Sequence, residues 1–148
     1  DLWIIVDYYR KRWHIEQLFR TLKKMGLGQD RVQLGSTSAL IRLIAIAMEV
    51  AAKVLRLVQA RDCDEGYPIE EEFTPEQIEL LHKFNAYYSG KTEKQKNPHP
   101  PHQLSYATWV IAKLGSHHHY MKGKPGPIII ARGLQRFIEY FHWNDALE

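Results

Sequence analysis

The sequence of 148 residues contains few of the features that mark several common protein classes. A single cysteine, Cys63, permits no internal disulfide, so a reducing compartment is expected rather than secretion. The longest apolar helical stretch, from Leu40 to Val58, is interrupted by four charged residues and therefore predicts no membrane span. The sequence also lacks a signal peptide, an internal repeat, a glycine-rich phosphate loop and clear strand alternation. These absences favour a helical protein without a membrane partner.

Charge is unevenly distributed along the chain. The formal net charge is +3, and residues 1–31 alone hold seven Lys or Arg against four acids, which is also +3. Residues 62–79 hold eight acids and no Lys or Arg. A basic segment indicates an anionic partner, most commonly nucleic acid, whereas the ordinary alternative is two solvated helix faces. The acidic stretch matches no calcium loop and is interpreted as a solvated connector.

Periodicity predicts five helices, over about 2–25, 38–60, 74–89, 103–114 and 133–143. The second is apolar around much of its circumference and is expected to be central. The third opens at Thr74 with Pro75 and Gln77, the pattern of a capping box. The segment Ile128–Ile130 follows Pro-Gly-Pro and is expected to be extended. The predicted fold is therefore an all-α bundle of four to five helices.

The first predicted helix carries the most informative stripe of polar residues. At about 100° per residue, Tyr9, Arg12, Glu16, Arg20 and Lys23 share one face, with Trp13 at its edge. Ile15, Phe19 and Leu22 belong to a neighbouring apolar face, expected to be covered by another helix or a second copy of the chain. The stripe fits exposed i,i+4 ion pairs, worth about 0.3–0.5 kcal/mol each. Alternatively, the bases bind phosphates and the carboxylate binds a divalent metal, as phosphoryl transfer requires.

The spacing Tyr9-x2-Arg12-x3-Glu16-x6-Lys23 resembles the Y-x2-R-x3-E-x6-K signature of DDE transposases from bacterial insertion sequences of the insertion sequence four group. The resemblance implies the C-terminal part of an RNase-H-like transposase whose catalytic sheet is largely absent from this chain. It implies that residues 1–36 are the last catalytic-core helix with its following loop, and that residues 37–148 are a C-terminal helical region suited to subunit pairing. Blocks at 112–115, 123–127 and 131–134 are also similar to that family.

The same resemblance implies roles for individual residues. Glu16 would be the third catalytic acid and one of three ligands of Mg²⁺ or Mn²⁺ in the intact enzyme. DNA contacts would come from Tyr9, Arg12, Trp13, Arg20 and Lys23. The partners would be transposon terminal repeats, target DNA and a second subunit in a homodimer, in the bacterial cytoplasm. The two upstream aspartates of the family have no counterpart in this sequence, so this piece alone is expected to be inactive and to bind no metal tightly.

Two alternatives and one further motif remain open at this stage. The chain could be a non-catalytic DNA-binding remnant of a transposase, or a helical protein-interaction module. Salt-dependent DNA affinity would separate these two, because phosphate binding weakens as salt rises. The motif His117-His118-His119 invites a metal interpretation, but adjacent histidines in a loop point in different directions. A solvated loop that gains positive charge below neutral pH is the favoured interpretation.

Overall fold

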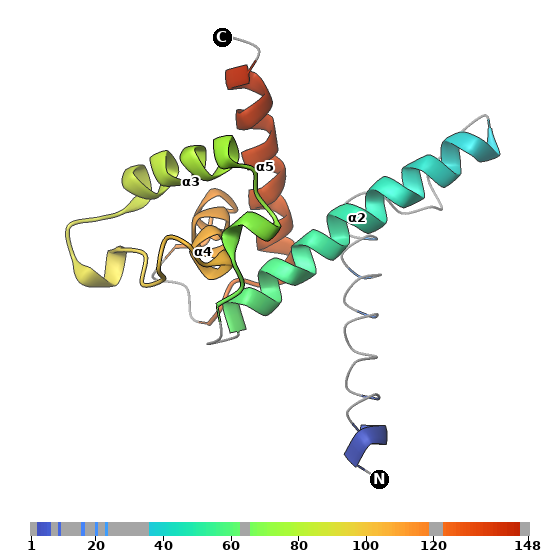
Figure 1. The fold of residues 1–148 in the computed structure, drawn as a ribbon, viewed down its shortest axis with the longest axis horizontal. Helices are drawn as coiled ribbons and strands as arrows, with labels where there is room; N and C mark the ends of the chain where they lie inside the picture. Colours follow the sequence, from blue (N-terminus) through green and yellow to red (C-terminus); the bar gives the residue numbers. More distant parts are fainter. Residues whose placement is uncertain are drawn as a thin grey trace. The chain divides into compact units, whose positions relative to one another are not determined.

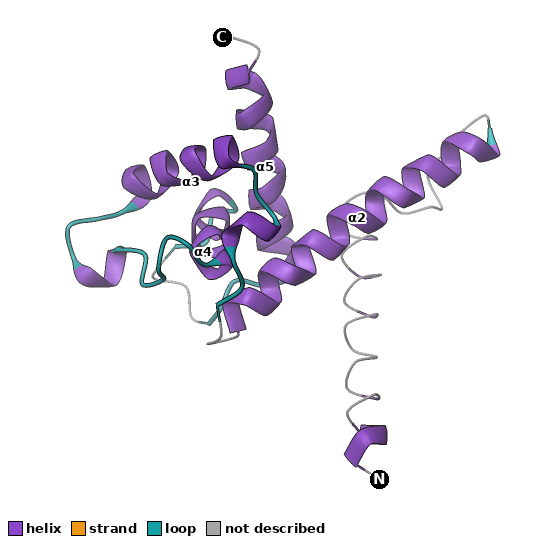
Figure 2. Ribbon diagram, in the orientation of Figure 1, coloured by secondary structure: helices purple, strands orange, loops and turns teal. Residues whose placement is uncertain are grey.

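A computed structural model describes residues 3–6, 9, 16, 20, 23, 36–62, 66–118 and 123–145 (Figures 1 and 2). The elements with defined bounds are the α-helices α2 (Thr37–Asp62), α3 (Pro75–Tyr88), α4 (Leu104–Leu114) and α5 (Pro127–Asp145), and the 3₁₀ turns η2 (Ile69–Glu71) and η3 (Glu93–Gln95). Residues 3–6, 9, 16, 20 and 23 are also helical. The described residues form no strand, and only an isolated antiparallel bridge joins Pro68 to Gln103. The all-α prediction is thus confirmed.

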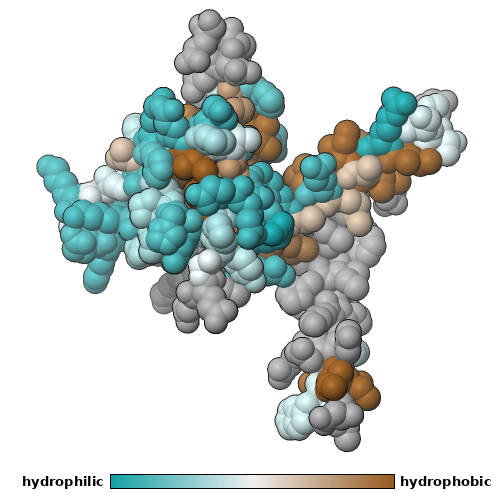
Figure 3. Space-filling view, in the orientation of Figure 1, coloured by the Kyte–Doolittle hydropathy of each residue, from teal (hydrophilic) through white to brown (hydrophobic). Residues whose placement is uncertain are grey.

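The chain divides into two compact units, residues 1–55 and residues 56–148, and the boundary falls inside α2. In the first unit, α2 buries Ala47, Ala51 and Val54, which recur at the three- and four-residue spacing of one helix face. Ile41 and Ile46 are about 60% exposed, and apolar surface is visible along this helix in Figure 3. The helix that was expected to be central therefore has an exposed apolar side in its first half. No described helix is long and apolar enough to cross a membrane.

The core of the second unit is built around α4. Every residue of this helix except Trp109 and Lys113 is buried, and the helix packs against α3, α5 and η2. The largest side chains in this core come from all the surrounding elements: Leu57, Ile69, Leu81, Leu104, Ile111, Ile130, Leu134 and Phe137. The sequence LSYATWVIAKL contains no charge before Lys113, so solvent exposure of this helix would be costly. The central helix of this unit is α4.

The ends of α3 and α4 follow standard capping chemistry. The Thr74 hydroxyl accepts a hydrogen bond from the Gln77 backbone N–H at 3.4 Å, and the Gln77 side chain accepts one from the Thr74 N–H at 3.2 Å. The predicted capping box is thus confirmed. After α4, the His117 N–H donates to the Ala112 carbonyl and the Ser116 N–H to that of Lys113. Ser116 adopts a φ of 71°, the left-handed conformation that this type of helix end requires.

The expectation of an extended segment at 128–130 is wrong, because α5 begins at Pro127 and includes these isoleucines. Pro127 at the first helical position is already restricted to helical φ, and burial of Ile130 and Ala131 outweighs the weak helix propensity of β-branched residues. Gly133 lies inside α5 because the helices approach closely there: a Cβ at Gly133 would overlap the Ile111 carbonyl oxygen of α4. The sequence predicts Gly133 as the start of the last helix. In the structure it lies inside the helix, where the lack of a side chain permits the close approach of α4.

Candidate nucleic-acid interface

Four of the six predicted site residues lie within the described part of the chain. Tyr9, Glu16, Arg20 and Lys23 are each helical and exposed, and the Tyr9 side chain is 67% exposed. Their spacings of seven, four and three residues correspond to whole helical turns, so ideal helical geometry places them within a sector about 60° wide. One carboxylate, two cations and a phenol therefore face solvent on one side of the helix predicted from their spacing.

The other residues of this interface lie outside the described residues. They are Arg12 and Trp13, together with the apolar residues Ile15, Phe19 and Leu22. Whether the apolar face is covered by another helix or by a second copy stays a prediction. Trp3, Ile4 and Ile5, near the start of the chain, are more than half exposed.

The exposed stripe suits contacts with an anionic polymer. Arg presents a fork of donors that matches a phosphate, and Lys offers a mobile point charge. Exposure of Arg20 and Lys23 leaves both accessible to such a ligand. Among the described residues, no three His, Cys, Asp or Glu side chains lie together as a metal site would require. Glu16 supplies a single oxygen-donor ligand, so the described residues do not by themselves fit a complete divalent-metal centre.

The histidine cluster is described only at His117 and His118, since His119 lies outside the described residues. The Nδ1 atom of His117 is buried and has no hydrogen-bond partner among the described residues. Burial lowers the pKa of His117, and the nearby charges of Lys113, His118 and Arg61 lower it further. His117 therefore stays neutral to a lower pH than an ordinary histidine, which argues against the prediction that it adds positive charge just below neutral pH.

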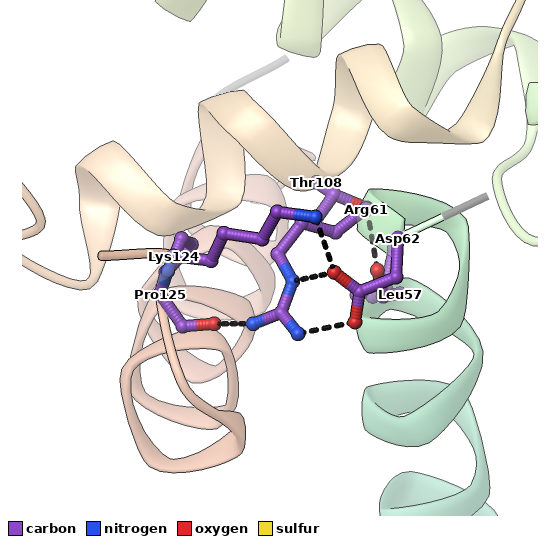
Figure 4. A network of polar contacts seen from close by, with 6 residues as sticks. All are labelled: Leu57, Arg61, Asp62, Thr108, Lys124 and Pro125. Carbon is purple, nitrogen blue, oxygen red and sulfur yellow. Dashed lines mark hydrogen bonds and ion pairs between the residues drawn. The ribbon is translucent and has the colours of Figure 1, made fainter. Parts of the chain in front are cut away.

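A polar network missed by the sequence reasoning anchors the end of α2 (Figure 4). The Arg61 guanidinium donates to the Asp62 carboxylate and to the backbone carbonyl of Pro125, just before α5. Lys124 donates to Asp62 Oδ1 at 2.8 Å. Beside them, the buried Thr108 hydroxyl lies 3.1 Å from the Leu57 carbonyl oxygen. These contacts connect α2, α4 and the loop before α5.

The network also changes the interpretation of the acidic stretch. Asp62 pairs with Arg61 and Lys124, while Arg56 lies 2.9 Å from the Glu71 carboxylate and 2.7 Å from that of Glu72. The hydrogen bond from Arg61 is the main cause that lowers the pKa of Asp62, with a further contribution from Lys124. Three acids of the stretch thus hold structural contacts, rather than forming a purely solvated connector. Arg61 and Asp62 follow directly on a predicted helix, but the sequence does not indicate their distant partners Lys124 and Pro125.

Residues 3–48 match the family model described as the transposase DDE domain. The matched range contains all six predicted site residues and ends within α2. No curated protein matches the chain. Transposases act on DNA, and those of the DDE family typically use a divalent metal, so the match agrees with the exposed basic stripe and the single carboxylate. The match over residues 3–48 supports a chain derived from a DDE transposase.

Proposed function

We propose that this chain is the C-terminal part of a transposase that cleaves and transfers DNA strands at transposon ends. The observation that carries the proposal is the match to a transposase DDE domain over the residues that bear the Tyr-Arg-Glu-Lys spacing. The helical conformation and exposure of Tyr9, Glu16, Arg20 and Lys23 support it, because a helix that grips DNA must present these side chains to solvent. The insertion sequence four group is the proposed source of the signature.

In this proposal each residue of the stripe has a distinct task. Glu16 is the third catalytic acid and would contribute one carboxylate to a divalent metal in the intact enzyme, where such a metal would supply activation of water or hydroxyl. Arg12, Arg20 and Lys23 neutralise the phosphates on either side of the scissile bond. Tyr9 donates a hydrogen bond to the backbone, and Trp13 stacks on a base displaced from the duplex. The other two acids of the catalytic triad are not assigned to any residue of this sequence.

The proposed partners are those that the resemblance to DDE transposases implies. The stripe binds terminal-repeat DNA, the helical region 37–148 pairs two subunits in a synaptic complex, and the protein works in the bacterial cytoplasm at the nucleoid. In the alternative, a DNA-binding remnant without catalysis, the cations still contact phosphates but Glu16 has no catalytic role. Glu16→Gln separates the two, because it removes the charge of the carboxylate and leaves the cations in place.

Cleavage by the 148-residue chain gives the first test. We expect no strand cleavage of a terminal-repeat duplex in Mg²⁺ or Mn²⁺, since a single acid cannot assemble the metal centre. Robust Mg²⁺-dependent cleavage that Glu16→Gln abolishes would contradict this expectation. In the parent protein, we expect Glu16→Gln to abolish cleavage while the affinity for end DNA in the absence of metal is retained. Normal cleavage by that variant would refute the catalytic assignment of Glu16.

A further inference from the structure

The exposed side of α5 carries two cations followed by two aromatic rings at helical spacing, far along the chain from the helix considered above. Arg132, Arg136, Tyr140 and Trp143 are spaced by four, four and three residues, which places them within a sector about 80° wide on an ideal helix. All four side chains are exposed, Tyr140 to 53% and Trp143 to 71%. These four residues are referred to below as the α5 stripe.

The aromatic part of the α5 stripe continues onto α3. The Tyr140 ring meets the Phe84 ring edge-on at 5.4 Å between centroids, and Phe84 in turn contacts the buried Phe137 at 6.3 Å. Tyr87, which is 81% exposed, lies 5.1 Å from the Tyr88 ring. A ring held from below by a packed core, as Tyr140 is, loses little conformational entropy when a ligand stacks on it. The surface is therefore an aromatic platform that is supported from below at Tyr140.

The cations beside this platform are not neutralised by described acids, and Arg136 is held in place by hydrogen bonds. Arg136 donates to the Leu114 carbonyl at 2.6 Å and to the Ser116 hydroxyl at 3.0 Å, which fixes its guanidinium at the end of α4. No described carboxylate forms an ion pair with Arg132 or Arg136. Two acids of these helices have other partners: Glu139 accepts a hydrogen bond from Gln135, and Glu79 pairs with Lys83.

The pKa of Tyr88 shows that other groups of this surface lie near it. The pKa of Tyr88 is raised chiefly by burial and then by the nearby Tyr140 and Tyr87, whereas the Arg136 guanidinium acts in the opposite direction. Three tyrosines and one arginine thus share a single surface of the second unit. Cations beside exposed rings are typical of surfaces that track a phosphate backbone and stack on unpaired bases. Duplex bases are already stacked on one another and do not engage such rings.

We propose that the α5 stripe, together with Tyr87 of α3, binds single-stranded DNA, with the arginines on phosphates and the rings on unpaired bases. This inference deepens and rests on the proposed function, since strand transfer exposes unpaired DNA near transposon ends. It assigns a second DNA-binding surface to the region 37–148, separate from the stripe around Glu16.

The test uses the whole chain and a fluorescein-labelled oligothymidine of about 16 nucleotides, near the upper site size of single-strand binding folds. A duplex of the same length is the comparison, and fluorescence anisotropy gives both affinities. Tyr87→Ala and Trp143→Ala each weaken oligothymidine binding roughly fivefold or more, because stacking on one base is lost. Arg132→Gln reduces the slope of log affinity against log salt by about 0.7. The matched controls Tyr67→Ala and Lys94→Gln, at exposed positions elsewhere, leave both quantities unchanged.

Two results would overturn the inference. One is oligothymidine affinity that Tyr87→Ala and Trp143→Ala leave unaltered. The other is a change of oligomeric state in these variants, measured by light scattering, with oligothymidine binding intact, which would make the surface a protein–protein interface. The proposed function is tested separately by duplex binding of Arg12→Ala/Lys23→Ala, where unchanged affinity would contradict it. Each pair of variants therefore reports on its own surface.

Discussion

Gly133 offers a sharp test of the packing between α4 and α5, because the close approach of these helices should make Gly→Ala destabilising instead of stabilising. In an unobstructed helix, Gly→Ala stabilises by about 1 kcal/mol. At Gly133 the added Cβ would overlap the Ile111 carbonyl oxygen and lie only 2.9 Å from the Gly115 nitrogen. Both obstacles are backbone atoms, which have no alternative rotamer. Relief therefore requires the two helices to separate.

Separation of the helices loosens contacts among the most deeply buried side chains, including Leu134 and Phe137 of α5 and Ile111 of α4. Overpacking of a core typically costs 1–3 kcal/mol, and a rigid backbone obstacle lies at the upper end. After the propensity gain is subtracted, we expect Gly133→Ala to lower the free energy of unfolding by about 2 kcal/mol. For a chain of this size that corresponds to a drop in Tm of roughly 4–8 °C.

The assay is thermal and urea unfolding followed by far-ultraviolet circular dichroism. Gly126→Ala is the matched control, because a Cβ at Gly126 meets no atom within 4 Å. We expect this control to change the free energy of unfolding by less than about 0.5 kcal/mol, since reduced unfolded-state entropy offsets a weaker helix start. A Tm for Gly133→Ala at or above that of the wild type would refute the close approach of α4 and α5.

Three further substitutions test other contacts of the second unit. Thr74→Ala removes the side-chain half of the capping box of α3, the hydroxyl that accepts from the Gln77 N–H, and unfolding experiments should show a loss of about 1 kcal/mol; an unchanged midpoint would contradict the cap. Thr108→Val removes the buried hydroxyl, which lies within hydrogen-bond distance of the Leu57 and Leu104 carbonyl oxygens, and should destabilise by about 1 kcal/mol in the same assay, whereas a gain would argue against a stabilising hydrogen bond from this hydroxyl. Asp62→Asn tests pH dependence. Because the folded-state pKa of Asp62 is lowered, its contribution is present above the ordinary value of 3.8 and is lost as the pH falls through the folded value. Wild type should therefore be more stable than Asp62→Asn near neutral pH, by less than about 1 kcal/mol for a solvent-screened pair, and the difference should vanish in strong acid. A difference that is constant with pH would show that the pair contributes nothing.

Local signals in the sequence were sufficient to predict much of the helical structure. The Thr74-Pro75-Gln77 pattern located the start of α3, and Gly115 located the end of α4, because caps depend on residues adjacent in the chain. Ile128–Ile130 was misjudged because tertiary burial, not local propensity, decides its conformation. Gly133 was misread for a related reason: its role is set by a helix that lies about 20 residues earlier in the sequence.

The candidate sites show the same division between local and distant information. The stripe through Tyr9, Glu16, Arg20 and Lys23 depends only on helical period, and these four residues are helical and exposed as that period predicts. The contacts of Arg61 with Pro125 and of Lys124 with Asp62 bridge more than 60 residues of sequence. No periodicity can reveal such pairs, since they follow from how the helices pack.

The most direct test of the central claim is the salt dependence of duplex DNA binding by the whole chain. If Arg12 and Lys23 contact phosphates, Arg12→Ala/Lys23→Ala should weaken binding and make the slope of log affinity against log salt shallower by about 1.8. Lys83→Ala/Lys94→Ala removes the same charge from exposed positions on α3 and η3 and should leave the slope unchanged. Equal slopes and affinities for the wild type and Arg12→Ala/Lys23→Ala would contradict the claim that this helix grips transposon DNA.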